Sequence, residues 1–275
     1  MAITSQPGRK AADDGFKTRL FVEDGLAEGA SVGLGATQAH YFLHVLRLKS
    51  GDRVALFNGR DGEWLARIDG FGRGWCSLTV NRRRRSQTAE PDLWLLFAPI
   101  KRARVDFLVQ KATELGVSGL WPVFTRHTQM ARVNTDRLRA IATEAAEQCG
   151  RLTVPAIFEP AAFDDVIGRW PGDRRLLLCE ARGTAPPVAD VLASEAGKIG
   201  AEGGKIGAEG GPGVPWAVLI GPEGGFARSE LDALHDLAFV TAVGLGPRIL
   251  RAETAALAAL TCWQAMLGDW RGGDA

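Results

Sequence analysis

The sequence predicts a two-part α/β protein in which a small β-rich module precedes a parallel sheet covered by helices. Short apolar runs occur at close spacing between residues 19 and 80. From residue 93 onward, apolar runs alternate with helical stretches, a pattern typical of a parallel sheet with helices on its faces. Between the two regions, Asn81 is followed by four arginines and a polar stretch that ends at Pro91. We therefore expect the domain boundary within residues 82–91.

Composition sets only broad limits on function. The chain has 275 residues, of which 46% are hydrophobic and 24% charged, with a net charge of +1. A near-neutral balance does not exclude a nucleic-acid partner, because a local basic face can coexist with acidic residues elsewhere. Residues 1–16 lack periodicity and we expect a disordered tail there. No run approaches the roughly 18 apolar residues of a membrane span, so we expect no membrane segment and a cytoplasmic location.

Cysteine and histidine spacing gives no sign of a metal site. The four cysteines are widely spaced and form no CxxC pair, which is typical of reduced, buried thiols. His40 and His44 lie four residues apart, but no cysteine or acidic residue stands at ligand spacing from them. We expect no bound metal.

The N-terminal module, residues 17–85, is expected to be a small β-barrel. Asn58-Gly59 and Asp61-Gly62 separate two apolar runs and predict a hairpin. Residues 36–48 carry apolar positions at helical spacing and predict a short helix that bears His40, His44 and Arg47. The arginine run has two interpretations that the sequence does not separate: a solvated linker or edge strand, and a phosphate-contacting patch.

The C-terminal region, residues 91–272, alternates between strands and helices. Strands are predicted at residues 93–98, 119–124, 175–179, 216–220 and 240–245. Helices are predicted at residues 103–115 and at 134–149, the second capped by Asn134 or Thr135. Ser229-Glu-Leu-Asp232 opens another helix with a start that resembles a capping box. An Ala/Leu-rich helix ends the domain.

One segment departs from this alternation. Lys198-Ile-Gly-Ala-Glu-Gly-Gly204 is repeated at once as Lys205-Ile-Gly-Ala-Glu-Gly-Gly211. Such glycine content disfavours a helix and buries little, and seven residues are too few for a solenoid repeat. We expect residues 197–213 to form a mobile surface insert without catalytic importance.

Three loops that follow predicted strands share a chemistry suited to ligand binding. They are Cys179-Glu180-Ala-Arg182, Ile220-Gly-Pro-Glu-Gly-Gly-Phe226 and Leu245-Gly-Pro-Arg-Ile-Leu-Arg-Ala-Glu-Thr254. Glycine-rich turns between a strand and a helix expose backbone N–H groups, and loops at one edge of a parallel sheet converge on a crevice. The glycine loop fits neither the phosphate-loop nor the dinucleotide fingerprint. Many backbone donors and little fixed charge suit a nucleoside-like ligand better than ATP.

These loops also carry a family resemblance, which covers roughly residues 18–270. The chain resembles the RsmE family of 16S rRNA uridine N3-methyltransferases, within the SPOUT class. The matching segments are Lys111-Ala-Thr-Glu-Leu-Gly-Val117, Glu147-Gln-Cys-Gly-Arg151, Leu219-Ile-Gly-Pro-Glu-Gly-Gly225, Leu245-Gly-Pro-Arg-Ile-Leu-Arg-Ala-Glu-Thr-Ala255, Arg19-Leu-Phe-Val22 and His44-Val-Leu-Arg47.

The resemblance implies a PUA-like, RNA-binding N-terminal barrel and a SPOUT-type parallel sheet with a deep trefoil knot. Sequence rules alone disfavour that knot, because chains rarely thread through loops. It further implies transfer of a methyl group from S-adenosyl-L-methionine to N3 of a uridine in 16S rRNA of the small ribosomal subunit, by a homodimer. The cofactor-binding residues that it implies are Glu180, Leu219, Ile220, Gly221, Glu223, Gly224, Gly225, Leu245, Gly246, Leu250 and Thr254.

Catalysis is expected from residues near the pocket mouth. Arg251 would stabilise the uridine anion that develops as N3 loses its proton, and Glu114 or Glu253 would accept that proton directly or through water. Each glutamate also has a purely structural interpretation: Glu114 as a partner across its own helix and Glu253 as a favourable charge at a helix N-terminus. The residues expected to contact RNA are Arg19, His40, Arg47, Lys101, Arg102, Arg104, Gln148 and Arg151.

Three other functions remain open from the sequence. The chain could be a SPOUT methyltransferase that acts on another RNA, or a non-catalytic RNA-binding factor in ribosome assembly. The third is an enzyme that binds a nucleotide through the glycine loop; the absence of Lys-Ser/Thr after Gly225 argues against it.

Overall fold

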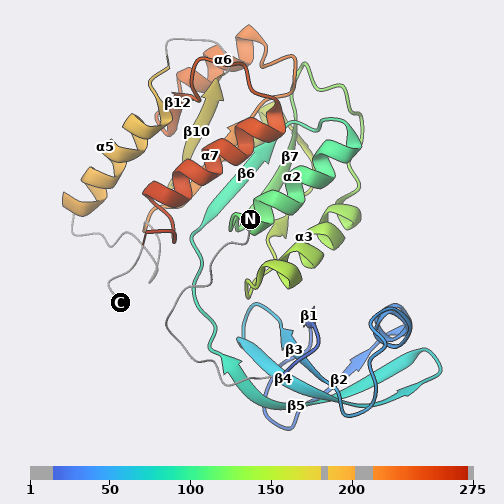
Figure 1. Ribbon diagram of the computed structural model, residues 1–275. Helices are drawn as coiled ribbons and strands as arrows, with labels where there is room; N and C mark the ends of the chain where they lie inside the picture. Colours follow the sequence, from blue (N-terminus) through green and yellow to red (C-terminus); the bar gives the residue numbers. More distant parts are fainter. Residues whose placement is uncertain (1–14, 181–184, 202–212, 272–275) are drawn as a thin grey trace. The chain divides into compact units, whose positions relative to one another are not determined.

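The computed structural model describes residues 15–180, 185–201 and 213–271, and its contacts divide the chain into two compact units that meet between Gln87 and Thr88 (Figure 1). The N-terminal unit is a five-stranded sheet in the order β1-β3-β4-β5-β2. Its strands are β1 (Arg19–Phe21), β2 (Ser31–Leu34), β3 (Arg53–Phe57), β4 (Glu63–Gly72) and β5 (Trp75–Arg85). Strands β3 and β4 pair antiparallel, which confirms the predicted hairpin.

The single helix predicted near residue 40 is two short pieces. Helix α1 (Ala36–His40) continues directly into a π-helical turn, η1 (Tyr41–Val45). The turn leads to Arg47, whose φ of 56° lies in the left-handed region. A non-glycine residue rarely adopts that conformation, so the chain leaves the helix sharply at this point.

The arginine run is the end of β5, and it lies beside a buried acid. Glu63, at the start of β4, has no exposed surface and forms ion pairs with Arg19, Arg84 and Arg85. Burial alone would raise the pKa of the Glu63 carboxyl, but hydrogen bonds from Arg85, Arg19 and Arg84 outweigh burial and lower the pKa to about 2. This part of the run is therefore the end of a strand that pairs with β4, and the edge-strand interpretation needs correction, because β5 as a whole lies between β4 and β2.

The C-terminal unit is a parallel sheet in the order β12-β10-β11-β6-β7-β8, with β9 paired to β7. Its strands are β6 (Leu93–Phe97), β7 (Gly119–Phe124), β8 (Ala156–Ile157), β9 (Ala161–Ala162), β10 (Arg175–Glu180), β11 (Trp216–Ile220) and β12 (Val240–Gly244). Its helices are α2 (Arg102–Glu114), α3 (Thr135–Cys149), α4 (Phe163–Gly168), α5 (Val188–Ala201), α6 (Arg228–His235) and α7 (Ala252–Met266). The predicted strands and long helices are present within one or two residues of their expected ends.

Two hydrophobic cores lie on the two faces of this sheet. One joins the strands to α2, α3, α5 and α7, of which α7 and α2 are seen in front of the sheet in Figure 1. The other joins the strands to α4 and α6. Alternate residues of each buried strand face opposite cores, as for Leu177 and Leu178 of β10. The central strands are apolar throughout because both of their faces are covered.

Two local predictions need correction. The repeat was expected to hold no helix, but Lys198 to Ala201 form the last turn of α5, because Ile199 is buried in the core; residues 202–212 lie outside the described part of the chain. Helix α6 was expected to start at Ser229. Its N-cap is Ala227, whose N–H donates to Glu230 Oε2 at 2.8 Å.

Helix α3 has the predicted cap, since Asn134 Oδ1 accepts from Arg137 N–H at 2.9 Å. Among the described residues, no helix has both the length and the apolar content to cross a membrane.

Candidate cofactor pocket and catalytic residues

A pocket of about 550 Å³ lies where β10, β11 and β12 end. Its wall contains Cys179, Glu180, Ile220, Gly221, Pro222, Glu223, Gly224, Gly225, Phe226, Leu231, Leu245, Gly246, Arg248, Ile249, Leu250, Arg251, Ala252 and Ala255. The loops predicted after β11 and β12 therefore contribute; of the first predicted loop, Cys179 and Glu180 contribute, while Ala181 and Arg182 lie outside the described residues. Because the strands are parallel and adjacent, their carboxyl ends share one edge of the sheet.

The loop after β11 approaches its neighbours closely. A Cβ atom on Gly221 would lie 2.9 Å from the Phe226 ring, so any larger residue there would require that ring to move. The far side of the loop is held by His127, whose Nδ1 donates to the Gly225 carbonyl oxygen at 3.1 Å. His127 follows β7, so the glycine loop is held by a second strand end as well as its own.

Glu180, at the end of β10, is a fixed carboxylate in the pocket wall. Its side chain is 9% exposed and Oε1 contacts Nε2 of His235, the last residue of α6. Next to it, burial raises the pKa of the Cys179 thiol to about 12, with the Cys262 thiol adding to the shift. Cys179 is therefore a neutral wall residue and no nucleophile.

The loop after β12 turns at Gly246, where φ is +96°, and ends at Arg251, the N-cap of α7. Arg248, Ile249 and Arg251 are exposed. Glu253 lies in the first turn of α7 with its side chain 12% exposed, and its Oε2 is buried with no hydrogen-bond partner among the described residues. The loop therefore presents two arginines to solvent and one largely buried carboxylate.

Arg104, in the first turn of α2, joins two of the pocket loops. Its Nη1 lies 3.0 Å from Glu223 Oε1, and its Nε lies 3.7 Å from Glu253 Oε1. The sequence predicted an RNA contact for this residue. It gave no hint of these partners, because they lie 119 and 149 residues further along the chain.

Comparison with known proteins agrees with this geometry. A family model of an RNA methyltransferase domain matches residues 88–264, and a model of an RNA methyltransferase PUA domain matches residues 34–73. Ribosomal RNA small subunit methyltransferase E (RsmE) of Rickettsia conorii is 32% identical over 243 residues, which is 88% of this chain and 93% of the relative. The chain belongs to the RsmE family.

Further members support the same fold. The RsmE protein of Bacillus subtilis is 26% identical over 253 residues, covering 88% of this chain and 94% of that protein. The crystal structure of the enzyme from Neisseria gonorrhoeae, bound to S-adenosyl methionine, has a TM-score of 0.78 and 26% identity, over 91% of this chain and 98% of that one. A Legionella pneumophila protein in complex with SAM gives 0.73 and 25%, over 92% and 99%. The predicted combination of a SPOUT-type α/β domain and a PUA-like domain is confirmed.

The residues that the RsmE resemblance assigned to the cofactor lie in the pocket wall, with two exceptions. Leu219 is 1% exposed and packs in the core on the α4 and α6 side of the sheet. Thr254 is exposed in the first turn of α7. Strand alternation explains Leu219: its neighbour Ile220 faces the α7 side, so Leu219 faces away from it.

Glu114, Gln148 and Arg151 lie at the opposite edge of the sheet from the pocket. Helix α2 starts near the pocket and has 13 residues, so Glu114 at its end is roughly 18 Å further along the helix axis. There it forms an ion pair with Lys111 at 2.8 Å. Gln148 lies in the last turn of α3, which also leads back to the amino ends of the strands.

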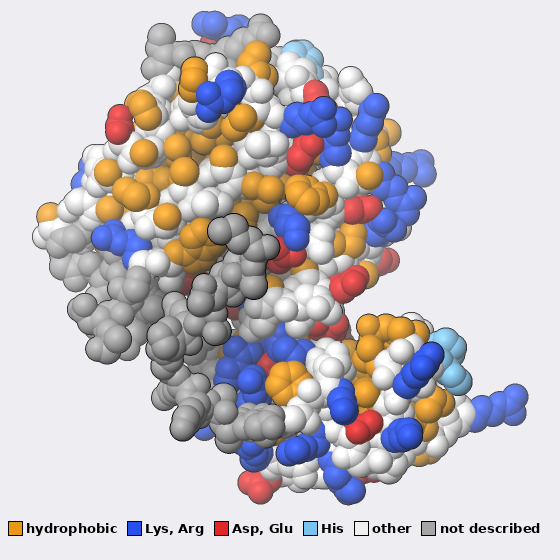
Figure 2. Space-filling view, viewed as in Figure 1, with side chains coloured by type: hydrophobic (Ala, Val, Ile, Leu, Met, Phe, Trp, Pro, Cys, Tyr) orange, Lys and Arg blue, Asp and Glu red, His pale blue; other side chains and the backbone are white. Residues whose placement is uncertain are grey.

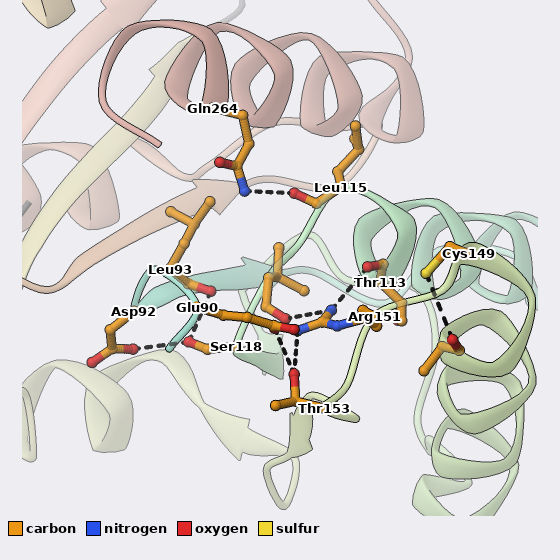
Figure 3. Close-up of polar contacts among 12 residues, drawn as sticks. Glu90, Asp92, Leu93, Thr113, Leu115, Ser118, Cys149, Arg151, Thr153 and Gln264 are labelled. Carbon is orange, nitrogen blue, oxygen red and sulfur yellow. Dashed lines mark hydrogen bonds and ion pairs between the residues drawn. The ribbon is translucent and has the colours of Figure 1, made fainter. Parts of the chain in front are cut away.

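Arg151 is a buried residue at that edge whose hydrogen bonds join several segments of the chain. Its Nη1 donates to the carbonyl oxygens of Thr113 and Val117 at 2.8 and 3.0 Å, and its Nη2 contacts Glu90 and Thr153 (Figure 3). Its side chain is 8% exposed. Two of the segments that carry the RsmE resemblance, around Glu114 and around Arg151, therefore meet each other, and their contacts there are structural.

The residues predicted to contact RNA in the N-terminal unit have different surroundings. Arg19 is 10% exposed, pairs with Glu63 at 2.6 Å and stacks over the Phe57 ring at 4.5 Å. His40 and Arg47 are exposed on either side of η1, beside the exposed side chains of Tyr41 and Leu43. Of the three, His40 and Arg47 have the accessibility that an RNA contact needs.

Proposed function

We propose that this protein transfers the methyl group of S-adenosyl-L-methionine to N3 of a uridine in 16S rRNA of the small ribosomal subunit, in the cytoplasm. The observation that carries the proposal is the pocket formed by three strand-end loops, in a chain of the RsmE family whose solved neighbours from Neisseria gonorrhoeae and Legionella pneumophila bind SAM. Besides two glutamates and two arginines, the wall consists of glycine backbone and apolar side chains, which suit a nucleoside ligand that needs donors at close range.

The residues present fit this cofactor. Glu180, oriented by His235, offers a carboxylate that accepts hydrogen bonds from ribose hydroxyls. Gly221, Gly224 and Gly225 allow a flat base to approach the backbone. Leu245 and Leu250 supply apolar contact on the other side of the pocket. We assign these residues to cofactor binding.

The protein itself forms no covalent bond in this reaction, and its main task is to position the two reactants. When bound, S-adenosyl-L-methionine supplies a methyl group that is already electrophilic on its sulfonium. Arg251, exposed in the pocket wall, donates to an oxygen of the uracil ring and stabilises the negative charge that grows as N3 loses its proton. Glu253, two residues away, accepts that proton directly or through one water. The C–S bond breaks as the C–N3 bond forms, so positioning dominates the rate.

RNA contact is proposed for exposed cations near this mouth and on the N-terminal unit. Lys101 and Arg102 begin α2, at the same edge of the sheet as the pocket, and both are exposed. Figure 2 shows Lys and Arg side chains gathered on the right-hand flank of the larger unit. Such side chains contact phosphates and fix the position of the RNA without reading its sequence. His40 and Arg47 add a contact from the PUA-like unit.

We also propose that the active form is a homodimer. Helix α7 carries one charged residue, Glu253, in fifteen. Its buried side packs in the core, yet its outward positions Leu257, Ala258, Thr261 and Ala265 are uncharged as well. Figure 2 shows apolar side chains gathered over this helix. A helix that is uncharged on all sides is usually covered on all sides, and a second copy of the chain would cover it. The deep trefoil knot stays a prediction.

The test is methyl transfer from labelled S-adenosyl-L-methionine to small ribosomal subunits that lack the modification. We expect one label per subunit and N3-methyluridine on nucleoside mass spectrometry. Arg251→Ala should reduce transfer at least 100-fold with an unchanged thermal unfolding midpoint. Label in another base or another RNA would correct the substrate. Absence of label with intact RNA binding would show a binding factor instead of an enzyme.

A further inference from the structure

We infer that Arg104 is a positioning residue of the methyl-transfer site, which holds the Glu253 carboxylate at the mouth of the cofactor pocket and keeps it apart from Glu223. The inference rests on the proposed function and assigns a role within it. Arg104 would act through Glu253 and would contact neither the cofactor nor the RNA.

The position of Arg104 is set by the end of β6. Ala98 N–H donates to the Ile220 carbonyl oxygen at 3.0 Å, so β6 and β11 end together at the pocket edge. After the turn that follows, the Lys101 carbonyl oxygen accepts from Arg104 N–H at 2.8 Å and closes the first turn of α2. Arg104 therefore starts from backbone that is tied to the loop carrying Glu223.

The guanidinium lies between two acids that belong to different elements of the chain. Glu223 lies in the glycine loop after β11, and Glu253 lies in the first turn of α7. The contact between Arg104 and Glu223, at 3.0 Å, has the length of a hydrogen bond. The contact between Arg104 and Glu253, at 3.7 Å, is an ion pair but is too long for a hydrogen bond. Without the cation, two carboxylates would face each other across the pocket mouth and repel.

Because it is more buried, Glu253 depends on Arg104 more strongly than Glu223 does. Its side chain is 12% exposed, whereas that of Glu223 is 42% exposed. Its Oε2 is buried and accepts no hydrogen bond from the described residues. A carboxylate in that state is costly unless a cation lies beside it, and within the described part of the chain Arg104 is the cation that contacts it. Without Arg104, Glu253 would turn toward water and leave the reacting position.

Neighbouring cations on α2 lack this arrangement. Lys101 and Arg102 are exposed and form no ion pair with the described residues, which suits contacts with RNA phosphates. Arg104 is 32% exposed with its guanidinium already engaged by two acids. Cations of the same helix turn thus have two roles. Lys101 and Arg102 are available to the RNA, and Arg104 holds the catalytic carboxylate.

The test compares Arg104→Ala, Arg104→Lys and the matched control Arg139→Ala, which removes an exposed arginine of α3 paired with Asp136. Single-turnover transfer to unmodified small subunits is measured at saturating S-adenosyl-L-methionine, together with the Kd of that cofactor and the salt dependence of subunit binding. We expect a 10- to 100-fold lower rate for Arg104→Ala, partial recovery for Arg104→Lys and no change for Arg139→Ala. Both binding measurements should stay within about 2-fold of the wild-type protein.

The decisive step repeats Arg104→Ala in a Glu253→Gln background. If Arg104 acts through Glu253, its removal there costs less than about 2-fold, because coupled residues are not additive. The inference is overturned if Arg104→Ala lowers the transfer rate as much in that background as in the wild type. It is also overturned if Arg104→Ala lowers the salt slope of subunit binding by about one, which marks a lost phosphate contact, or if it changes only the Kd of the cofactor. Arg104→Gln replaces Arg104→Ala if the latter unfolds. An inactive wild-type protein would refute the proposed function itself; an active wild type with a fully active Arg104→Ala refutes this inference alone.

Discussion

Glu230 binds the backbone of Arg126 across 104 residues of sequence: its Oε1 accepts from Arg126 N–H at 2.8 Å, and its Oε2 accepts from Ala227 N–H at 2.8 Å. Glu230 is 4% exposed. One buried carboxylate therefore caps α6 and ties the loop after β7 to the end of the glycine loop. His127, next to Arg126, adds its hydrogen bond to Gly225. The pocket wall is held from outside by a strand end that contributes no wall residue.

Removal of this tether should destabilise the protein and weaken cofactor binding together. Glu230→Ala leaves two N–H groups without their acceptor, which costs about 2 to 6 kcal/mol at roughly 1 to 3 kcal/mol for each unsatisfied group. The glycine loop then loses its fixed shape, and we expect the Kd of S-adenosyl-L-methionine to rise at least 10-fold. Urea unfolding and calorimetry measure the two effects.

Asp232→Ala is the control for Glu230→Ala. It removes a carboxylate of the same helix that is 56% exposed and forms an ion pair with Arg228. An exposed pair of this kind contributes about 0 to 1 kcal/mol, and the Kd should not change. Equal unfolding free energies for the two variants would refute the role given to Glu230.

Gly246 should be required for its backbone conformation and not for space. Its φ is +96°, and no atom lies within 4 Å of where a Cβ would be. Gly246→Ala therefore costs strain of about 1 to 3 kcal/mol, which the loop can relieve by moving out of the pocket. We expect a 10-fold or larger rise in the Kd of S-adenosyl-L-methionine. Gly168→Ala, at an equally open position without positive φ, should leave the Kd unchanged; equal effects would contradict the argument.

The sequence was sufficient for most of the fold because the buried strands are local signals. Runs such as residues 216–220 are apolar at every position, which two covered faces require. What it missed depended on contacts far along the chain. Glu63 lies in a strand where a polar residue normally faces water, and only the fold brings Arg19 and Arg84 to it. Ile199 similarly extends α5 into the repeat because a core is there to receive it.

The candidate site divides in the same way. The three strand-end loops were predictable as a group because the carboxyl ends of parallel strands meet at one edge of the sheet, and the RsmE resemblance supplied individual residues within them such as Gly221 and Gly246. Residues on helices were not, because α2 places Arg104 at the pocket and Glu114 at the opposite edge of the sheet. Two residues on one helix therefore need not belong to one site.

The Glu63 cluster should give the protein an acid-sensitive component of stability. The pKa of Glu63 is about 2 in the folded state against an ordinary value of 4.5, so the carboxylate stabilises the fold above pH 4.5. That contribution, about 3 kcal/mol at 1.36 kcal/mol per unit of pKa, is lost as the pH falls from about 5 to 2. We expect the unfolding free energy of the wild type to approach that of Glu63→Gln over this range.

Urea unfolding at pH 7, 5 and 3 measures this convergence. Asp69→Asn, which removes an exposed ion pair of the same strand with Arg67 at 3.2 Å, is the control and should lose less than about 1 kcal/mol at pH 7. A constant difference between the wild type and Glu63→Gln at all three pH values would show that the arginines do not stabilise the charged form.

The outward face of α7 should be the dimer contact if the active form is a homodimer. Thr261 is exposed at the centre of the uncharged face and lies one turn from Leu257 and Ala265. A glutamate there would be buried without a cation in the dimer, which costs several kcal/mol, so Thr261→Glu should raise the dimer Kd at least 100-fold. Light scattering at micromolar concentration measures it. Ala140→Glu, which adds the same charge to an exposed position of α3, should leave the dimer intact. A wild type that is monomeric at these concentrations, or a Thr261→Glu variant that stays dimeric, would exclude this face.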